Sequence, residues 1–530
     1  MLIDKNIING KIFTMESETA VCEAFSIFDG KIVACGSSEE ILKNEAKEVI
    51  DLKGKCVLPG FIDSHQHILS YARGLHAVNL RNVTSWKEAK EKLKERAAIT
   101  PEGQWIKGTS FNHENWDDPT LPHKDELDDI SSNHPILISR YCMHVHVANT
   151  MALQMAGIVK GFVPTAENSI DLDALEEPTG ILWENAVSPI LRIIPDPLAS
   201  FEDKKNAVAE VLKDMNRYGI TGAHPIQGKF CDAEEFIGLY QMLNKENRLN
   251  VRIYISFDEY PCFDMKTGFG DYKIKYGFYK IYSDGSLGSR AAALYEPYSD
   301  MPGMTGVLNY SQAEITEMCQ RAYDIDIQIA IHAIGDKGLD IALTAIETVY
   351  FKNPKKDVRF RLVHVMCMNE ELIRRMKKLP VVLDIQPKFV SSNVRWSEDR
   401  LGMERSKYAY PWRRLIDEGF ILTGGSDLPV EHYNPFLGIY AITTRKDLNG
   451  YPKGGWYPEQ RVTAYEAIEM YTKNAAYASF EEHIKGTISN GMLADFIVLD
   501  RNPFIIPTDD LKNVIVEKTY LGGEEVFSQN

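Results

Sequence analysis

Residues 57–67 read VLPGFIDSHQH, an apolar run that ends in two histidines separated by one residue. The run has the composition of a buried strand. Side chains of a strand alternate between its two faces, so Asp63, His65 and His67 are expected on one face. Neutral imidazole is a ligand for Zn, Fe, Ni and Cu. The pair therefore predicts part of a metal site at the end of a strand.

Seven later segments also have the composition of buried strands: 220–224, 251–257, 278–284, 327–332, 360–364, 381–386 and 420–427. Helical patterns lie between many of them, at 203–218, 314–324, 337–350, 370–378 and 404–417. Eight strand-then-helix units predict an α/β fold, a (β/α)₈ TIM barrel, whose active site lies at the carboxyl ends of the strands. A doubly wound sheet is the alternative, but no G-x-G-x-x-G follows a strand.

The two ends of the chain have the pattern of short β-strands. Asn9-Gly10 and Asp29-Gly30 are hairpin signals in residues 1–56, and Gly522-Gly523 stands among the strands predicted within residues 485–530. We expect these two segments to form one composite β-sandwich beside a barrel domain at 57–484. The long gap after His67 predicts an insertion at about 103–200 that covers the barrel mouth.

Metal-binding side chains recur at the predicted strand ends. His332 and His364 end the fifth and sixth strands, Lys280 lies in the fourth, and Asp427 ends the eighth. Together with the first two histidines they would converge on one opening of the barrel. The set fits a pair of divalent ions, the more buried one on His65, His67 and Asp427 and the more exposed one on His332 and His364.

Lys280 is a poor ligand as a free ammonium group, which has no lone pair. Carboxylated by CO₂ it becomes an anionic bridge between two ions, which would activate a hydroxide as the nucleophile. Asp427 is then the candidate proton shuttle. Each residue also has an ordinary interpretation: Lys280 as an ion-pair partner of Asp284, and Asp427 as a turn residue. A mononuclear centre on His65, His67 and Asp427 is a further alternative.

The charge, hydropathy and cysteine content of the chain bear on its binding partners and its location. A net charge of −16 without a long basic run argues against nucleic-acid binding, and no run of about 18 apolar residues predicts a membrane span. The eight scattered cysteines and the polar start of the chain favour reduced thiols and a cytoplasmic location.

Several motifs carry a resemblance to a known family. They are LPGFIDSHQH at 58–67, KIYSDGSLGSR at 280–290, HAIGD at 332–336, His364, GSDLPV at 425–430, YTKNAA at 471–476 and GMLADFIVLD at 491–500. The chain resembles the amidohydrolase superfamily, in particular its YtcJ-like branch (amidohydrolase family 3), which includes N-substituted formamide deformylases. The resemblance covers nearly the whole chain, and implies a TIM barrel, a composite β-sandwich and the ligand roles above.

The resemblance implies a metal-dependent hydrolase that cleaves a non-peptide carbon–nitrogen bond in a small-molecule amide, with zinc as the default metal and one or two ions per chain. Within it, His144 matches a family pattern in the insertion and is a candidate substrate contact, as are Arg290, which suits a carbonyl or carboxylate, and Trp116. A homodimer is compatible with this family.

Two positions depart from the family pattern, and both are expected at the barrel mouth. Pro225 stands where relatives usually have an acidic residue, and Lys388-Phe389 stands where many relatives have a histidine nearby. Two alternatives to amide hydrolysis stay open. One is another hydrolysis on the same barrel, of a lactone or phosphotriester or by deamination. The other is a non-catalytic metal-binding sensor.

Overall fold

The computed structural model describes residues 2–81, 83–140, 145–162, 169–228, 231–260 and 265–529. The chain forms two compact units, one made of Met1–Leu69 with Val208–Asn530 and the other of Ser70–Ala207. The first unit contains the barrel and both ends of the chain, and it carries all the predicted metal ligands.

Eight parallel strands form one sheet in the first unit, in the order in which they occur along the chain. They are β8 (Phe61–Gln66), β15 (Ile220–Pro225), β16 (Arg252–Phe257), β17 (Ile274–Tyr282), β18 (Gln328–Ala333), β19 (Phe360–His364), β20 (Val381–Ile385) and β21 (Leu422–Gly424). Their interior is packed rather than open, since Phe278, Ala330 and Val363 belong to one buried cluster. The predicted strands are present, with ends shifted by a few residues.

The barrel closes where the residues after β21 meet the end of β8. The amide of Asp427 donates to the carbonyl of His65, and the amide of His67 donates to the carbonyl of Leu428, both at 2.8 Å. Gly425 permits this approach, because a Cβ there would lie 2.7 Å from the Cβ of His65 and 2.8 Å from its backbone nitrogen. The first and last strands of the barrel thus meet beside the predicted ligands.

One predicted strand is two strands in the structure. The apolar run that begins at Val57 first forms β7 (Cys56–Pro59), which pairs with strands outside the barrel. The barrel strand β8 begins only after Gly60, where a Cβ would lie 2.2 Å from Oγ1 of Thr221. The single-strand prediction was wrong here because all residues of both strands are buried, so their pattern shows no break.

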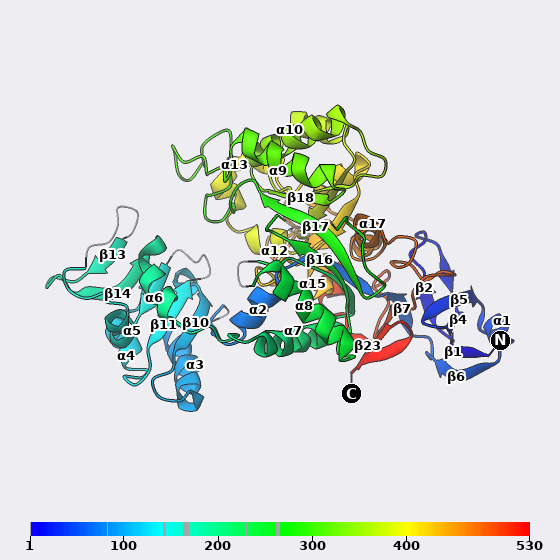
Figure 1. The fold of residues 1–530 in the computed structure, drawn as a ribbon, viewed down its shortest axis with the longest axis horizontal. Coiled ribbons are helices and arrows are strands. Elements are labelled where there is room, and N and C mark those ends of the chain that lie inside the picture. Colours follow the sequence, from blue (N-terminus) through cyan, green and yellow to red (C-terminus); the bar gives the residue numbers. More distant parts are fainter. Residues whose placement is uncertain are drawn as a thin grey trace. The chain divides into compact units, whose positions relative to one another are not determined.

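Helices follow the barrel strands on the outside, and Figure 1 shows α9 and α10 beside β17 and β18. The helices from the first barrel crossover onward are α7 (Phe201–Asn216), α8 (Ala233–Lys245), α9 (Gln312–Asp324), α10 (Asp336–Lys352), α11 (Glu370–Met376), α12 (Phe389–Asn393), α13 (Ser397–Ser406), α14 (Trp412–Asp417), α15 (Pro435–Thr444), α16 (Ala464–Met470) and α17 (Lys473–Ala478). The helix predicted at 404–417 is instead the end of α13 and all of α14, because Pro411 lacks the amide proton that a continuous helix needs. No helix in the described part of the chain is both long and apolar enough to cross a membrane.

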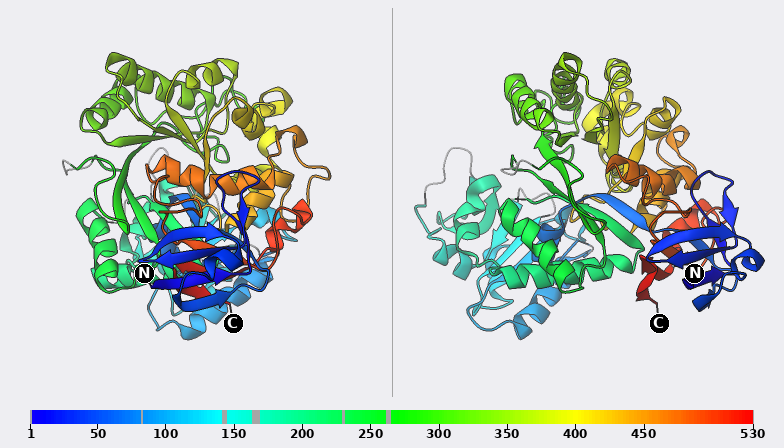
Figure 2. Two further views of the ribbon diagram at one scale, coloured as in Figure 1. Left: turned by 90° about the vertical axis from the view of Figure 1, so that its right-hand side faces the viewer. Right: turned by 45° about the vertical axis from the view of Figure 1, so that its right-hand side comes forward.

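Strands from the two ends of the chain share one six-stranded sheet, and Figure 2 shows the red C-terminal strands beside the dark-blue N-terminal ones. Its strands, in order, are β24 (Glu524–Ser528), β23 (Val516–Leu521), β22 (Phe496–Leu499), β7, β2 (Lys11–Phe13) and β3 (Val21–Cys22). A four-stranded sheet contains, in order, β5 (Lys31–Gly36), β4 (Ala24–Phe28), β1 (Ile3–Ile8) and β6 (Ala46–Asp51). The short helix α1 (Ser38–Ile41) packs against β4, β5 and β1. Side chains of both sheets, including Phe25 and Phe496, share one hydrophobic cluster.

The turn signals at the chain ends had different outcomes. Asp29-Gly30 joins the antiparallel pair β4 and β5, and Gly522-Gly523 joins β23 and β24; all four residues have positive φ, as a tight hairpin turn requires. The hairpin expected at Asn9-Gly10 was wrong. Asn9 does have a φ of 55°, but β1 and β2 on either side of it belong to different sheets.

A buried ion pair joins the barrel to the composite sheet. Arg252 at the start of β16 donates to both carboxylate oxygens of Asp495, at 2.6 and 2.8 Å. The same carboxylate accepts the amide of Gly522 at 2.8 Å. Both charged side chains are buried, and the charge of each compensates that of the other.

The second unit, which contains the region predicted as an insertion, has its own six-stranded sheet. In order, the sheet contains β13 (Ser169–Leu172), β14 (Pro178–Trp183), β12 (Val145–Ala148), β11 (Ile136–Arg140), β10 (Ile106–Phe111) and β9 (Val78–Asn79). Its helices are α3 (Trp86–Ile99), α4 (Lys124–Asp128), α5 (Thr150–Met155) and α6 (Ser188–Ile193), and α2 (Ile68–Gly74) leads into it. The unit therefore begins well before residue 103, where the insertion was expected to start.

We predict that Gly425→Ala destabilises the first unit by about 1–3 kcal/mol, because the new methyl group would overlap the backbone of His65. Urea denaturation followed by circular dichroism measures the change. Gly74→Ala is the matched control, since nothing lies within 4 Å of a Cβ at that position. Equal stability of the two variants would contradict the close approach at Gly425.

Candidate metal centre

Three of the predicted ligands form a compact cluster at the closing edge of the barrel. His65 is the penultimate residue of β8, His67 follows that strand, and Asp427 follows β21. The Oδ1 atom of Asp427 lies 3.4 Å from Nε2 of His65 and 3.4 Å from Nε2 of His67. One ligand atom from each of the three lies within 4.8 Å of the other two, so a single ion can contact all three.

The other two histidines lie beside this cluster. The rings of His332, on β18, and His364, which ends β19, have centroids 4.5 Å apart, and those of His65 and His364 are 5.4 Å apart. Nδ1 of His364 hydrogen-bonds the side-chain oxygen of Gln386, which leaves its Nε2 for another partner. Nε2 of His332 lies 3.4 Å from Oδ1 of Asp284.

Lys280 is buried in β17 with its ammonium nitrogen unpaired. Within the described residues Nζ has no hydrogen-bond partner, and it lies 5.3 Å from the ring centroid of Tyr282. The ion pair with Asp284 that stood as an alternative is not formed. Asp284 instead accepts the backbone amides of Ala293, Ile334 and Gly335.

Burial sets the protonation of these groups. It lowers the pKa of His65, lowers the pKa of His364 further, and lowers the pKa of Lys280 to about 7. Burial alone would raise the pKa of Asp427, but the imidazoles of His65 and His67 hold it well below its usual range. The cluster therefore offers imidazole nitrogens and an anionic carboxylate, the donor set that suits Zn²⁺ and related divalent ions.

Two of the predicted ligands have an unusual backbone. The φ angle of His364 is 73° and that of Asp427 is 55°, both in the left-handed region that disfavours residues with a Cβ. Val365, a β-branched residue, follows with a φ of 46° and is held by a 3.0 Å hydrogen bond from its amide to Ala333. Strain of this kind is typical of positions whose side chains must point in one required direction.

The structure describes two of the three candidate substrate residues. Arg290 donates to Asp300 at 2.7 and 3.1 Å. Trp116 is buried in the hydrophobic core of the second unit, with ring centroids 5.6 Å from Phe111 and 5.8 Å from Trp86. His144 lies outside the described residues. The substrate roles of all three residues stay predictions.

Sequence reasoning placed Phe389 at the barrel mouth without a role, and it missed Asp384 and Arg361. Phe389 stacks on His364 with centroids 5.9 Å apart and an interplanar angle of 7°. Asp384 lies below His65, with Oδ2 3.7 Å from Nδ1 of the ring, and pairs with Arg361. The available signal was a charged residue inside an otherwise apolar strand, in VVLDI and in FRLVH.

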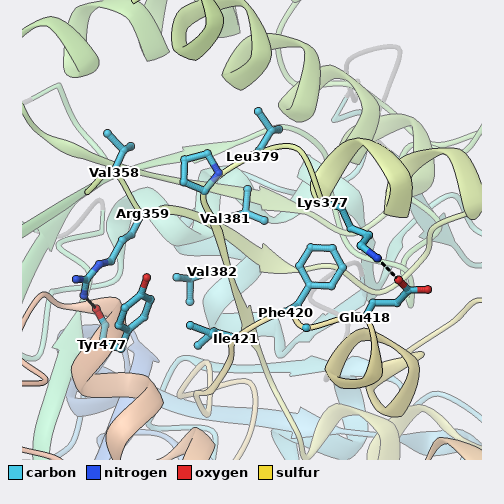
Figure 3. Close-up of a pocket in the computed structure, with 12 residues that line it drawn as sticks. Val358, Arg359, Lys377, Leu379, Val381, Val382, Glu418, Phe420, Ile421 and Tyr477 are labelled. Atoms are coloured by element: carbon cyan, nitrogen blue, oxygen red, sulfur yellow. Dashed lines mark hydrogen bonds and ion pairs between the residues drawn. The ribbon is translucent and has the colours of Figure 1, made fainter. Parts of the chain in front are cut away.

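A small cavity lies at the other end of the strands. It has a volume of about 190 Å³ and is lined by residues that include Val381, Phe420 and Arg359 (Figure 3). These residues stand at or before the amino ends of β19, β20 and β21, whereas the histidines stand at the carboxyl ends. The cavity therefore does not belong to the metal centre.

The comparisons with known proteins agree with this arrangement. A model described as "Amidohydrolase family" matches residues 48–527. YtcJ of Bacillus subtilis (strain 168) is 32% identical, over 98% of this chain and 99% of that protein. A protein named N-substituted formamide deformylase, from Arthrobacter pascens, is 28% identical, over 98% of this chain and 97% of its own length.

A solved structure of similar length has the same fold. It is described as an uncharacterized metal-dependent hydrolase from Pyrococcus horikoshii OT3, and it aligns with a TM-score of 0.77 at 28% identity, over 95% of this chain and 99% of that chain. The family match spans most of the chain, and the relatives align over nearly their full lengths. Together with the eight-stranded parallel sheet and its cluster of metal-binding side chains, they show that the chain belongs to the amidohydrolase family.

Proposed function

We propose that the protein hydrolyses a non-peptide carbon–nitrogen bond in a small amide, with N-substituted formamides as the leading substrate class. The observation that carries this proposal is the cluster of His65, His67 and Asp427, where three donor atoms lie close enough for one divalent ion. The similarity to a protein named N-substituted formamide deformylase supports the choice of substrate.

The donors divide into two sets that could hold two ions. His65, His67 and Asp427 would hold the first, and His332 with His364 the second. When bound, a divalent ion of this kind polarises a carbonyl group and lowers the pKa of water toward about 7. Zinc is the metal we propose, because imidazole and carboxylate donors in this combination suit it.

Lys280 fits the role of a shared anionic ligand after carboxylation. Its uncharged amine would attack CO₂, a bond would form between Nζ and carbon, and one proton would leave to solvent. Only a neutral amine has the lone pair for this step, and burial lowers the pKa of Lys280 to about 7. The absence of a described hydrogen-bond partner leaves Nζ available for it.

Asp427 is the residue we propose for proton transfer. It is anionic because the neighbouring imidazoles hold its pKa low, so it can accept a proton from the attacking water. The same carboxyl group would then give that proton to the departing nitrogen, so that the amine leaves neutral. The left-handed backbone at Asp427 directs its side chain toward His65 and His67.

The first prediction from this proposed function concerns the metal content of the protein and the role of Asp427. We expect about two equivalents of divalent metal in the purified protein, and Asp427→Asn should lower amide hydrolysis by about 10²–10⁴-fold, as loss of a general acid–base group does. Elemental analysis and a panel of N-substituted formamides, other amides and lactones provide the measurements. Asp509→Asn, which removes an exposed carboxylate paired with Lys446, is the control and should leave turnover unchanged.

Two results would count against the amide proposal. Turnover of lactones alone would assign another hydrolysis to the same site. Full metal loading with no turnover of any of these compounds would favour the non-catalytic alternative.

A second prediction tests carboxylation of Lys280. Metal-loaded protein equilibrated with ¹³C-bicarbonate should show a carbamate carbon signal by NMR, and Lys280→Met should lose that signal. Lys273→Met is the matched control, because Lys273 also has its pKa lowered by burial but lies at the other end of the barrel strand. A signal that persists in Lys280→Met would place the modification elsewhere.

A third prediction follows from the pKa of Lys280 in metal-free protein kept without CO₂. Between pH 7 and 10.5 Lys280 is neutral in the folded state and still protonated in the unfolded state. The free-energy cost of burying Lys280 is therefore largest below pH 7 and falls to zero as the pH approaches 10.5. The stability advantage of Lys280→Met should therefore fall as pH rises, by up to about 1.4 kcal/mol per pH unit. Urea denaturation of both proteins at several pH values measures it, and a gap independent of pH would contradict a neutral Lys280.

A further inference from the structure

A buried ion pair lies inside the barrel beneath the histidine cluster. Arg361 is on β19 and Asp384 on the neighbouring strand β20, and the side chains of both are fully inaccessible to solvent. The guanidinium Nη2 of Arg361 donates to Oδ2 of Asp384. Two charges at the centre of apolar strands are costly to bury unless they compensate each other and form further hydrogen bonds.

Further hydrogen bonds fix the Asp384 carboxylate in place. Its Oδ1 atom accepts the hydroxyl of Ser64 at 2.6 Å and the hydroxyl of Thr423 at 3.2 Å. Arg361 also donates to the backbone carbonyl of Ser64 at 2.7 Å. The guanidinium of Arg361 and the two hydroxyl groups thus compensate the negative charge of this buried carboxylate.

His65 stands between this carboxylate and Asp427. Its Nε2 atom lies 3.4 Å from Asp427, while its Nδ1 atom lies 3.7 Å from Oδ2 of Asp384. Nδ1 is buried and has no hydrogen-bond partner within the described residues. The ring thus has one nitrogen toward the candidate ion and the other toward a fixed anion.

Strand β20 supplies a similar partner to a second ligand. Gln386 follows the end of β20, two residues after Asp384, and its side-chain oxygen accepts from Nδ1 of His364. Both histidines therefore have Nδ1 directed at an acceptor from the same segment of chain. The difference is charge, since the acceptor at His65 is an anion and the one at His364 a neutral amide.

We propose that Asp384, fixed by Arg361, is a positioning residue that holds the Nδ1 proton of His65 and so directs the Nε2 lone pair of that ring toward the metal. The inference rests on the proposed metal centre but not on any substrate. An imidazole has two tautomers, and an acceptor at one nitrogen selects the tautomer whose other nitrogen can bind an ion. An anionic acceptor also makes the ring a stronger donor, and loss of such a partner typically weakens metal binding by about 10–100-fold.

The test compares zinc affinity in two variants that each neutralise a buried carboxylate paired with arginine. Asp384→Asn should weaken zinc binding by about 10–100-fold, measured by competition with a chromogenic chelator. Asp495→Asn is the matched control, because Asp495 is likewise buried against Arg252 but has no contact with the described ligands. Its zinc affinity should stay within about threefold of wild type even where its thermal stability falls.

Asp384→Asn leaves Arg361 without its counter-charge and could lower zinc affinity simply by unfolding the protein. A second variant separates these two effects. Arg361→Gln combined with Asp384→Asn removes both charges, and it should show the same loss of zinc affinity. Cobalt(II) substitution adds a readout of the ligand field, which should change in both Asp384 variants and not in Asp495→Asn.

A crystal structure of the zinc-loaded wild type decides the matter independently of folding. The inference requires the ion on Nε2 of His65 and Nδ1 within about 3.2 Å of Asp384. An ion on Nδ1, or wild-type zinc affinity in Asp384→Asn, overturns the positioning role while leaving the metal centre intact. A wild-type protein that binds no divalent metal overturns the proposed function as well.

Discussion

Closure of the barrel is the constraint on which the rest of the first unit depends. The backbone hydrogen bonds that join its first and last strands involve His65, His67 and Asp427 themselves. Residues more than 350 positions apart in sequence thus become neighbours in the same step that completes the sheet. An ion that needs all three donors can bind only the closed barrel, so binding and stability of the folded state are thermodynamically linked.

Polar groups inside the barrel fall into two layers with opposite properties. In the lower layer the charges of Arg361 and Asp384 compensate each other, and further hydrogen bonds join the pair to Ser64, Thr423 and His224. In the upper layer the nitrogen of Lys280 lacks a described partner. A buried polar atom without a partner costs free energy that a ligand can recover. The Arg361–Asp384 pair supports His65, and the unpaired nitrogen of Lys280 marks where a ligand is expected to bind.

Much of this arrangement could be predicted from sequence because barrel strands share a simple rule. Their carboxyl ends lie at one opening, so His332, His364 and Lys280 could be placed beside His65 without knowledge of the packing. The outer shell could not be predicted in this way. Asp384 and Arg361 face the interior below that opening, and their partners depend on which strands neighbour each other and on rotamers. Strand composition does not encode either property.

The sequence also failed where two environments produce the same pattern. The residues around Gly60 are buried in both sheets that they join, so nothing in their composition marked the change of sheet. The second unit was underestimated because its sheet mixes parallel and antiparallel pairs with short strands. Such strands lack the regular alternation with helices that identified the barrel.

The left-handed backbone at His364 and Asp427 has an evolutionary consequence. Glycine would occupy either conformation without steric cost. Substitution by glycine would relieve this backbone strain, but it would also remove a buried side chain and its donor atom. We therefore expect His364 and Asp427 to be retained in relatives that use these donor atoms, and the sequences of close relatives would show whether they are.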